Sequence, residues 1–251
     1  MIEIPTHLPS ELVPLAWLIG SWEGEGMVEY EVDGKLRMHP FRQRVDFTHT
    51  DLPYLEYRSR AWLLPINDET EADADEADSA ATTTGAEADS EPKPLLPEGV
   101  EALIPSGPKV SAADAEALDK LVPLTTETGY WRLARPRDTG DVGPGMLPAS
   151  GPTKFTNADA VEQLRNSQDG FDLEVTLAHP TGVSELYYGM IRGPRVDLAT
   201  EGVVRSAGSA EYRSATRMYG LVHGKMFWAW DIAALGNELA THASAQLARV
   251  E

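Results

Sequence analysis

The chain has 251 residues, and its 40 acidic against 21 basic side chains give a formal net charge of −19. This charge excludes strong binding to the phosphate backbone of nucleic acids and disfavours anionic membrane surfaces, because both are bound by cationic side chains. The absence of cysteine excludes disulfides, thiolate metal sites and a cysteine nucleophile. With no basic signal sequence and no apolar run long enough to span a bilayer, we expect a cytoplasmic protein.

The N-terminal part predicts a short helix followed by a long strand. The segment from Leu8 to Ile19 is typical of a helix that caps a larger fold. From Trp22 to Asp33, apolar residues or glycine alternate with mostly acidic residues. This period of two predicts a strand with one buried and one solvated face.

Two irregular insertions interrupt the strand pattern. The first, residues 65–122, has ten acidic and no basic side chains between 66 and 92, so we expect it to be largely disordered. An acidic interaction arm is one interpretation, but a tolerated surface loop is favoured because long surface insertions cost little entropy. Residues 111–118 within it predict a short capped helix. The second insertion, residues 137–170, is rich in glycine and proline, with a short helix capped by Thr156.

The remaining 159 residues are mostly strand-like and predict one compact domain. Further strands are predicted at residues 41–49, 54–62, 129–134, 171–178, 184–191, 196–204, 211–221 and 226–232. Nine or ten strands with mostly short links indicate an all-β fold, a closed antiparallel barrel, because closure removes exposed strand edges. A barrel of this size can enclose one ligand. The last segment, from Asn237 to Arg249, has apolar residues at helical spacing and predicts a C-terminal helix.

Four motifs, in chain order, resemble those of the nitrobindin family. They are Gly20-Ser21-Trp22-Glu23-Gly24-Glu25-Gly26, Glu127-Thr128-Gly129-Tyr130-Trp131-Arg132, Leu177-Ala178-His179-Pro180-Thr181-Gly182 and His242-Ala243-Ser244-Ala245-Gln246-Leu247-Ala248-Arg249. The motifs span the 159-residue core and neither insertion. The segments Glu185–Gly189 and Arg217–Gly220 resemble the longer mycobacterial and actinobacterial members of the family.

The resemblance implies a ten-stranded closed antiparallel barrel related to fatty-acid-binding proteins, to which the residue pattern adds a short N-terminal helix and a C-terminal helix. It implies one ferric b-type heme per chain, with His242 as the axial iron ligand. It further implies binding of nitric oxide and isomerisation of peroxynitrite to nitrate. The expected partners are these small molecules, with neither nucleic acid nor membrane, and a homodimer is a further expectation.

The residue pattern alone does not decide between alternative roles for the proposed site residues. A lone histidine such as His242 is more often a surface or packing residue than a ligand, and the resemblance reverses that preference. Trp230 and Ile232 share one strand face, where they form either an apolar heme wall or ordinary barrel core. Thr125 stands where many nitrobindins have a histidine near the heme, and Tyr30-Glu31-Val32 replaces a Tyr-Pro-Thr segment that lines the heme in many members.

A second histidine, His179, lies in a His-Pro-Thr-Gly turn after a strand. It is either a proton donor on the ligand side of a heme or a turn histidine bonded to the backbone. The second interpretation is favoured, because we expect the turn to lie between strands and not along a cavity wall.

An alternative function is a heme-free, lipocalin-like carrier of a small apolar ligand such as a fatty acid. Carriers of this kind hold the ligand carboxylate with arginine and tyrosine inside the barrel. A buried Arg213 or Arg217 beside Tyr219 would favour this alternative. A third hypothesis is an interaction module that uses the acidic insertion.

Overall fold

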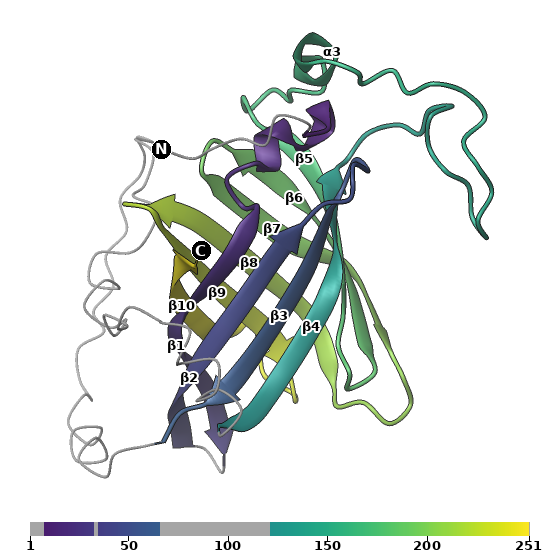
Figure 1. Ribbon diagram of the computed structural model, residues 1–251. Coiled ribbons are helices and arrows are strands. Elements are labelled where there is room, and N and C mark those ends of the chain that lie inside the picture. Colours follow the sequence, from purple (N-terminus) through teal and green to yellow (C-terminus); the bar gives the residue numbers. More distant parts are fainter. Residues whose placement is uncertain (1–7, 33–34, 66–120, 251) are drawn as a thin grey trace, which may run out of the picture.

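Ten antiparallel strands form a closed barrel in the computed structural model, which describes residues 8–32, 35–65 and 121–250 (Figure 1). The strands are β1 (Gly20–Val32), β2 (Lys35–Thr48), β3 (Leu55–Leu63), β4 (Val122–Leu133), β5 (Phe171–Ala178), β6 (Val183–Arg192), β7 (Arg195–Arg205), β8 (Tyr212–Val222), β9 (Lys225–Ala234) and β10 (Ala240–Val250). Each strand pairs with its neighbours in sequence, and β1 pairs with β10 to close the ring. The expected fold class and the predicted strands are therefore confirmed.

The alternating pattern seen in the sequence places one face of each strand inside the barrel. On β2, for example, Phe41, Gln43, Val45 and Phe47 are buried, while the residues that alternate with them are partly exposed. Large aromatic side chains fill the part of the barrel interior nearest the N-terminal segment, where Trp131 lies edge-on to Phe47 and to Tyr219. This end of the barrel is packed solid.

The N-terminal helix is shorter and tighter than expected. The segment forms a 3-10 helix, η1 (Ser10–Leu15), which lies at one end of the barrel (Figure 1). Its side chains Leu12 and Leu15 are fully buried. The buried carboxylate of Glu11 accepts a hydrogen bond from Arg135, just beyond β4, and Arg135 also donates to Asp141 at 2.8 and 2.9 Å. This ion cluster ties η1 to the second insertion.

The expected C-terminal helix is wrong, because residues 240–250 form strand β10. Alanine, glutamine and leucine favour a helix locally, but strand preference is decided by the surface that a segment covers. Ala243, Ala245 and Leu247 alternate on the buried face of β10. Their period of two, competing with the helical spacing, was the signal for a strand.

The second insertion contains the expected short helix, α3 (Ala158–Glu162). Its cap is Asn157, not Thr156, because the Asn157 side chain accepts a hydrogen bond from the backbone N–H of Ala160 at 2.9 Å. The acidic run and the predicted helix at residues 111–118 lie outside the described residues. None of the helices in the described part is long and apolar enough to cross a membrane.

The glycine motif closes the seam between the first and last strands. Gly24 pairs with Leu247, and Gly26 pairs with Ala245. A Cβ atom at Gly24 would lie 2.0 Å from the carbonyl oxygen of Gln246, and one at Gly26 would lie 2.1 Å from that of Ser244. Only glycine lets the two strands approach this closely at these positions, so the motif has a structural explanation.

Replacing Gly24 by alanine is expected to destabilise the barrel by about 1–3 kcal/mol, because the added methyl must push the β1 and β10 backbones apart. Urea unfolding followed by tryptophan fluorescence measures the change. Gly202→Ala on β7 is the matched control, since a Cβ there meets no atom within 4 Å. Equal midpoints for the two variants would contradict the close-approach explanation.

Candidate functional site

An interior cavity of about 330 Å³ lies at the end of the barrel opposite η1. Its walls come from β1 to β4, from β6 and from β8 to β10, together with the turns that follow β5, β7 and β9. Most of the lining is apolar, with Val28, Phe41, Trp228 and Ile232 among its members. Its size is at the lower end of the range for small-molecule sites.

The candidate cofactor residues predicted from the sequence meet in this cavity. His242, Trp230, Ile232 and Thr125 all line it, although they come from three strands. The glycine motif does not line the cavity, and its Trp22 is packed in the core with its indole N–H donated to the carbonyl of Leu18 at 2.8 Å.

His242 is held in one tautomer. Its Nδ1 lies 2.9 Å from the backbone carbonyl oxygen of Glu29 on β1, and a carbonyl only accepts, so Nδ1 has the hydrogen. The lone pair therefore lies on Nε2, which has no hydrogen-bond partner among the described residues. Burial lowers the pKa of His242, and the positive charge of Arg217 lowers it further against the opposing effect of the Glu29 bond. A neutral imidazole of this kind is the form that binds metal ions.

Trp230 separates two histidines along the cavity wall. Its ring meets that of His242 nearly edge-on, with centroids 5.3 Å apart, and lies nearly parallel to that of His179 at 6.1 Å. The Arg217 guanidinium lies 4.2 Å from the centre of the Trp230 ring, a cation–π distance. These contacts fix the orientation of Trp230.

A buried ion pair forms the floor of the cavity, and sequence reasoning did not assign it. Arg217 on β8 donates to both carboxylate oxygens of Glu127 on β4, at 2.7 and 3.0 Å. The two residues are 3% and 5% exposed. A second carboxylate, that of Glu185 on β6, lies 3.6 Å from Arg217. The bidentate geometry is the strongest arrangement available to an arginine–carboxylate pair.

Tyrosine hydroxyls complete the hydrogen bonding of both carboxylates. Tyr57 donates to Glu127 at 3.0 Å, and Tyr187 donates to Glu185 at 2.6 Å, with Tyr212 as a further donor to Glu185. The charged groups are thus satisfied without water, as buried charges require.

His179 belongs to this network, and the expectation that it is bonded to the backbone through its ring is wrong. Its Nε2 lies 2.6 Å from a carboxylate oxygen of Glu185, and its Nδ1 lies 3.6 Å from Glu127. The turn brings the ring into the cavity wall, because Glu185 on the following strand holds it there. An ionised carboxylate only accepts, so Nε2 is the donor.

The carboxylates stay ionised at neutral pH. Burial alone would raise the pKa of Glu127, but the charge and hydrogen bonds of Arg217 outweigh burial and lower it to about 2. Burial likewise opposes ionisation of Glu185, while the His179 bond and the Arg217 charge lower its pKa. The floor therefore contains two negative charges and the positive charge of Arg217.

Strand alternation contained the signal for this network. Arg217 has the same parity as the buried Ala215 and Tyr219, and Glu127 has the same parity as the buried Trp131. Arg213, the other arginine considered, is exposed. Arg213 has the same parity, so alternation alone does not distinguish the two arginines; the register of β8 shifts between Tyr212 and Ser214, which breaks the alternation at Arg213.

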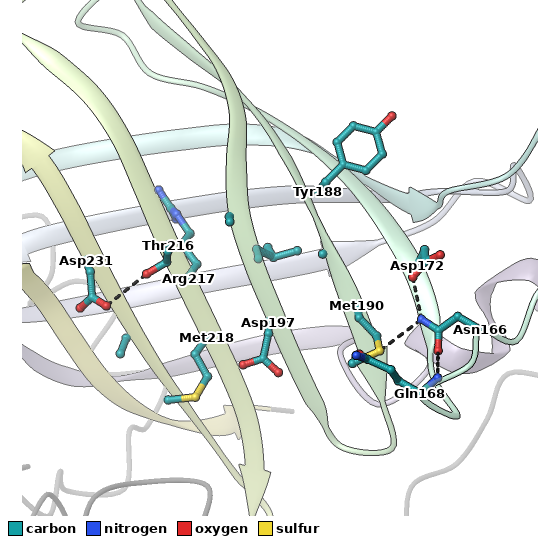
Figure 2. A pocket seen from close by; sticks show the side chains of 14 residues that line it. Asn166, Gln168, Asp172, Tyr188, Met190, Asp197, Thr216, Arg217, Met218 and Asp231 are labelled. Atoms are coloured by element: carbon teal, nitrogen blue, oxygen red, sulfur yellow. Dashed lines mark hydrogen bonds between the residues drawn. The ribbon is translucent and has the colours of Figure 1, made fainter. Parts of the chain in front are cut away.

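A larger hollow of about 590 Å³ lies along β6 to β9 (Figure 2). Several of its polar side chains have protein partners: Asn166 donates to Asp172 at 2.6 Å, Thr216 donates to Asp231 at 3.1 Å, and Tyr188 donates to Glu174 outside the lining. None of the described residues that line it is a histidine. The interior cavity is therefore the better candidate site.

The fold and the cavity define a closed β-barrel protein with an interior cavity lined by an oriented histidine. Residues 11–249 match the family model described as a THAP4-like, heme-binding beta-barrel domain, and the chain belongs to this family. The resemblance to nitrobindins is confirmed, and the domain is a heme-binding barrel.

Named relatives align with this chain over its full length. Two proteins named peroxynitrite isomerase, from Leifsonia xyli subsp. xyli (strain CTCB07) and Clavibacter michiganensis subsp. michiganensis (strain NCPPB 382), are 47% and 45% identical over 251 residues, which is 100% of each chain. The crystal structure of Rv2717c from M. tuberculosis superposes on this chain with a TM-score of 0.55 and 19% sequence identity. The match covers 97% of this chain and 99% of the Rv2717c chain. This last likeness supports the fold.

The ion pair predicts a specific acid sensitivity. Because the pKa of Glu127 is lowered on folding from 4.5 to about 2, its ionisation stabilises the fold above about pH 4.5, and this stabilisation is lost as the pH falls towards 2. The loss is on the order of 3 kcal/mol. Urea unfolding between pH 5 and 2 should show a steeper decline for wild type than for Glu127→Gln. Parallel pH profiles would contradict this role.

Proposed function

We propose that the chain binds one ferric b-type heme, with His242 as the axial iron ligand, and uses it to bind nitric oxide and to isomerise peroxynitrite to nitrate. The observation that carries the proposal is a neutral, oriented His242 in an apolar cavity, whose Nε2 has no hydrogen-bond partner in the part of the chain that the structure describes. Family membership and the names of the full-length relatives support it.

The donor set fits a heme. A b-type heme needs one imidazole nitrogen, apolar surface for the porphyrin, and a second shell that orients the imidazole. His242 supplies the nitrogen, and the carbonyl of Glu29 orients the ring. Trp230 and Ile232 supply apolar surface beside it. The absence of cysteine leaves histidine as the strongest ligand type in the chain.

When bound, ferric iron supplies a Lewis-acid site for nitric oxide or peroxynitrite. The chain's own contribution is to hold the imidazole in its ligating tautomer and to keep water from the site with an apolar wall. The contacts of Trp230 with His242 and Arg217 keep that wall rigid beside the ligand. Confinement by such a wall favours rearrangement inside the cavity over escape of reactive products.

The carrier alternative is weaker in this structure. Arg217 is buried beside Tyr219, as that alternative requires, and burial raises the pKa of Tyr219. However, the guanidinium already forms a bidentate pair with Glu127 and lies 3.6 Å from Glu185. Its positive charge is therefore engaged and not available to a ligand carboxylate.

Hemin titration tests the ligand assignment. Wild-type protein should give a saturable Soret shift at one hemin per chain, and His242→Ala should lose at least about tenfold in affinity, the range typical for loss of a ligand or of its support. His223→Ala is the matched control, because His223 is exposed in the β8–β9 turn. An unchanged Soret spectrum for His242→Ala would refute the assignment.

Stopped-flow mixing with peroxynitrite tests the activity. Hemin-loaded wild type should accelerate peroxynitrite decay and raise the yield of nitrate relative to nitrite, since the site favours rearrangement. The His242→Ala protein mixed with the same hemin should show little acceleration beyond free hemin. A decay rate equal to that of free hemin for wild type would contradict the proposed activity while leaving heme binding intact.

A further inference from the structure

The contacts of Glu127 are those of a bound ligand. Its carboxylate receives two parallel hydrogen bonds from the Arg217 guanidinium and a third from the hydroxyl of Tyr57. A planar guanidinium fork with an adjacent hydroxyl is the arrangement that recognises a carboxylate bidentately. In this barrel the carboxylate belongs to the protein itself.

We propose that Glu127 is a built-in occupant of a carboxylate-binding site on the cavity floor, and that it makes the wild-type cavity reject carboxylic acids whose carboxylate points inward to that floor. The residue thereby determines ligand specificity within a barrel whose interior otherwise contains what an acid-binding site needs. This inference goes beyond the heme function and does not depend on it.

The floor is within reach of a molecule in the cavity. Glu127 and Arg217 both line the cavity, together with His179 and Tyr212. A ligand whose charged end pointed inward would therefore meet the guanidinium directly if the Glu127 side chain were absent. The apolar wall of Phe41 and Ile232 would then surround the rest of the molecule.

Charge excludes acids from the wild-type floor. Two carboxylates already lie within 3.6 Å of Arg217, and burial strengthens their repulsion of a third. Glu185 does not take the place of Glu127, because it is fully engaged by His179, Tyr187 and Tyr212. Removing the Glu127 side chain alone thus leaves the two N–H groups of Arg217 that donate to it without their partner.

The ligand class follows from the size and polarity of the cavity. A volume of about 330 Å³ with a mostly apolar lining suits a monocarboxylic acid with a short or medium alkyl chain. Octanoate is the probe, and octanol is its uncharged counterpart.

Two substitutions at Glu127 distinguish the effect of its negative charge from the effect of its side-chain volume. Glu127→Ala removes both the carboxylate and its volume, whereas Glu127→Gln removes the charge but still fills the site. Calorimetric titration of the full-length protein without added hemin should show octanoate binding to Glu127→Ala at least about tenfold tighter than to wild type, the equivalent of one hydrogen-bonded ion pair. Glu127→Gln should gain much less, and octanol should bind all three proteins alike.

A second variant tests the role of the guanidinium. Adding Arg217→Met to Glu127→Ala should abolish the gain in octanoate affinity. A folded Glu127→Ala protein that binds octanoate no better than wild type would overturn the proposal, as would a gain that survives Arg217→Met.

Formate keeps the proposal testable if Glu127→Ala is unstable. Formate is a carboxylate without a tail, so it should raise the melting temperature of Glu127→Ala, or restore its folding, without affecting wild type. No response of Glu127→Ala to formate would contradict the proposal. Because no heme is present in these measurements, a failed hemin titration and a failed octanoate titration are separate results.

Discussion

The need to neutralise one arginine inside a barrel organises the interior of this protein. Arg217 is on β8, and its partners Glu127 and Glu185 are on β4 and β6, so the ion cluster joins strands around the wall. It also forms a layer across the interior. Below it lie the aromatic rings of Trp131 and Tyr219, and above it lies the cavity. Desolvating these charges is costly, and only a nearly complete set of hydrogen bonds offsets that cost.

The layer gives the two cavity histidines different environments. His179 faces the carboxylates of Glu127 and Glu185, which favour a donating ring. His242 faces apolar surface and a backbone carbonyl, and burial lowers its pKa. One histidine is thus placed to serve as a hydrogen-bond donor in a charged network, and the other keeps a free lone pair. Trp230 between them keeps the two environments apart.

The strands and the cavity residues were predictable because both depend on local periodicity or on motifs. Alternation predicted the barrel, and the family motif singled out His242. The strand identity of residues 240–250 was missed, since its buried alanines pack against the glycines of β1, a contact more than 200 residues away in sequence. The ion cluster was missed for a related reason: alternation places Arg217 and Glu127 on inward faces, but only the closed barrel shows that β8 and β4 bring the two side chains together.

The seam between β1 and β10 has a kinetic consequence. Its partners lie at opposite ends of the fold, so closing it has the largest loop entropy of any strand pairing and belongs among the slow steps of folding. His242 is on the closing strand, and its orienting bond to Glu29 crosses the seam. An open barrel therefore lacks the oriented imidazole even when its other strands are paired. With His242 in its proposed role, the capacity to take up a metal porphyrin therefore arises only when the ring closes.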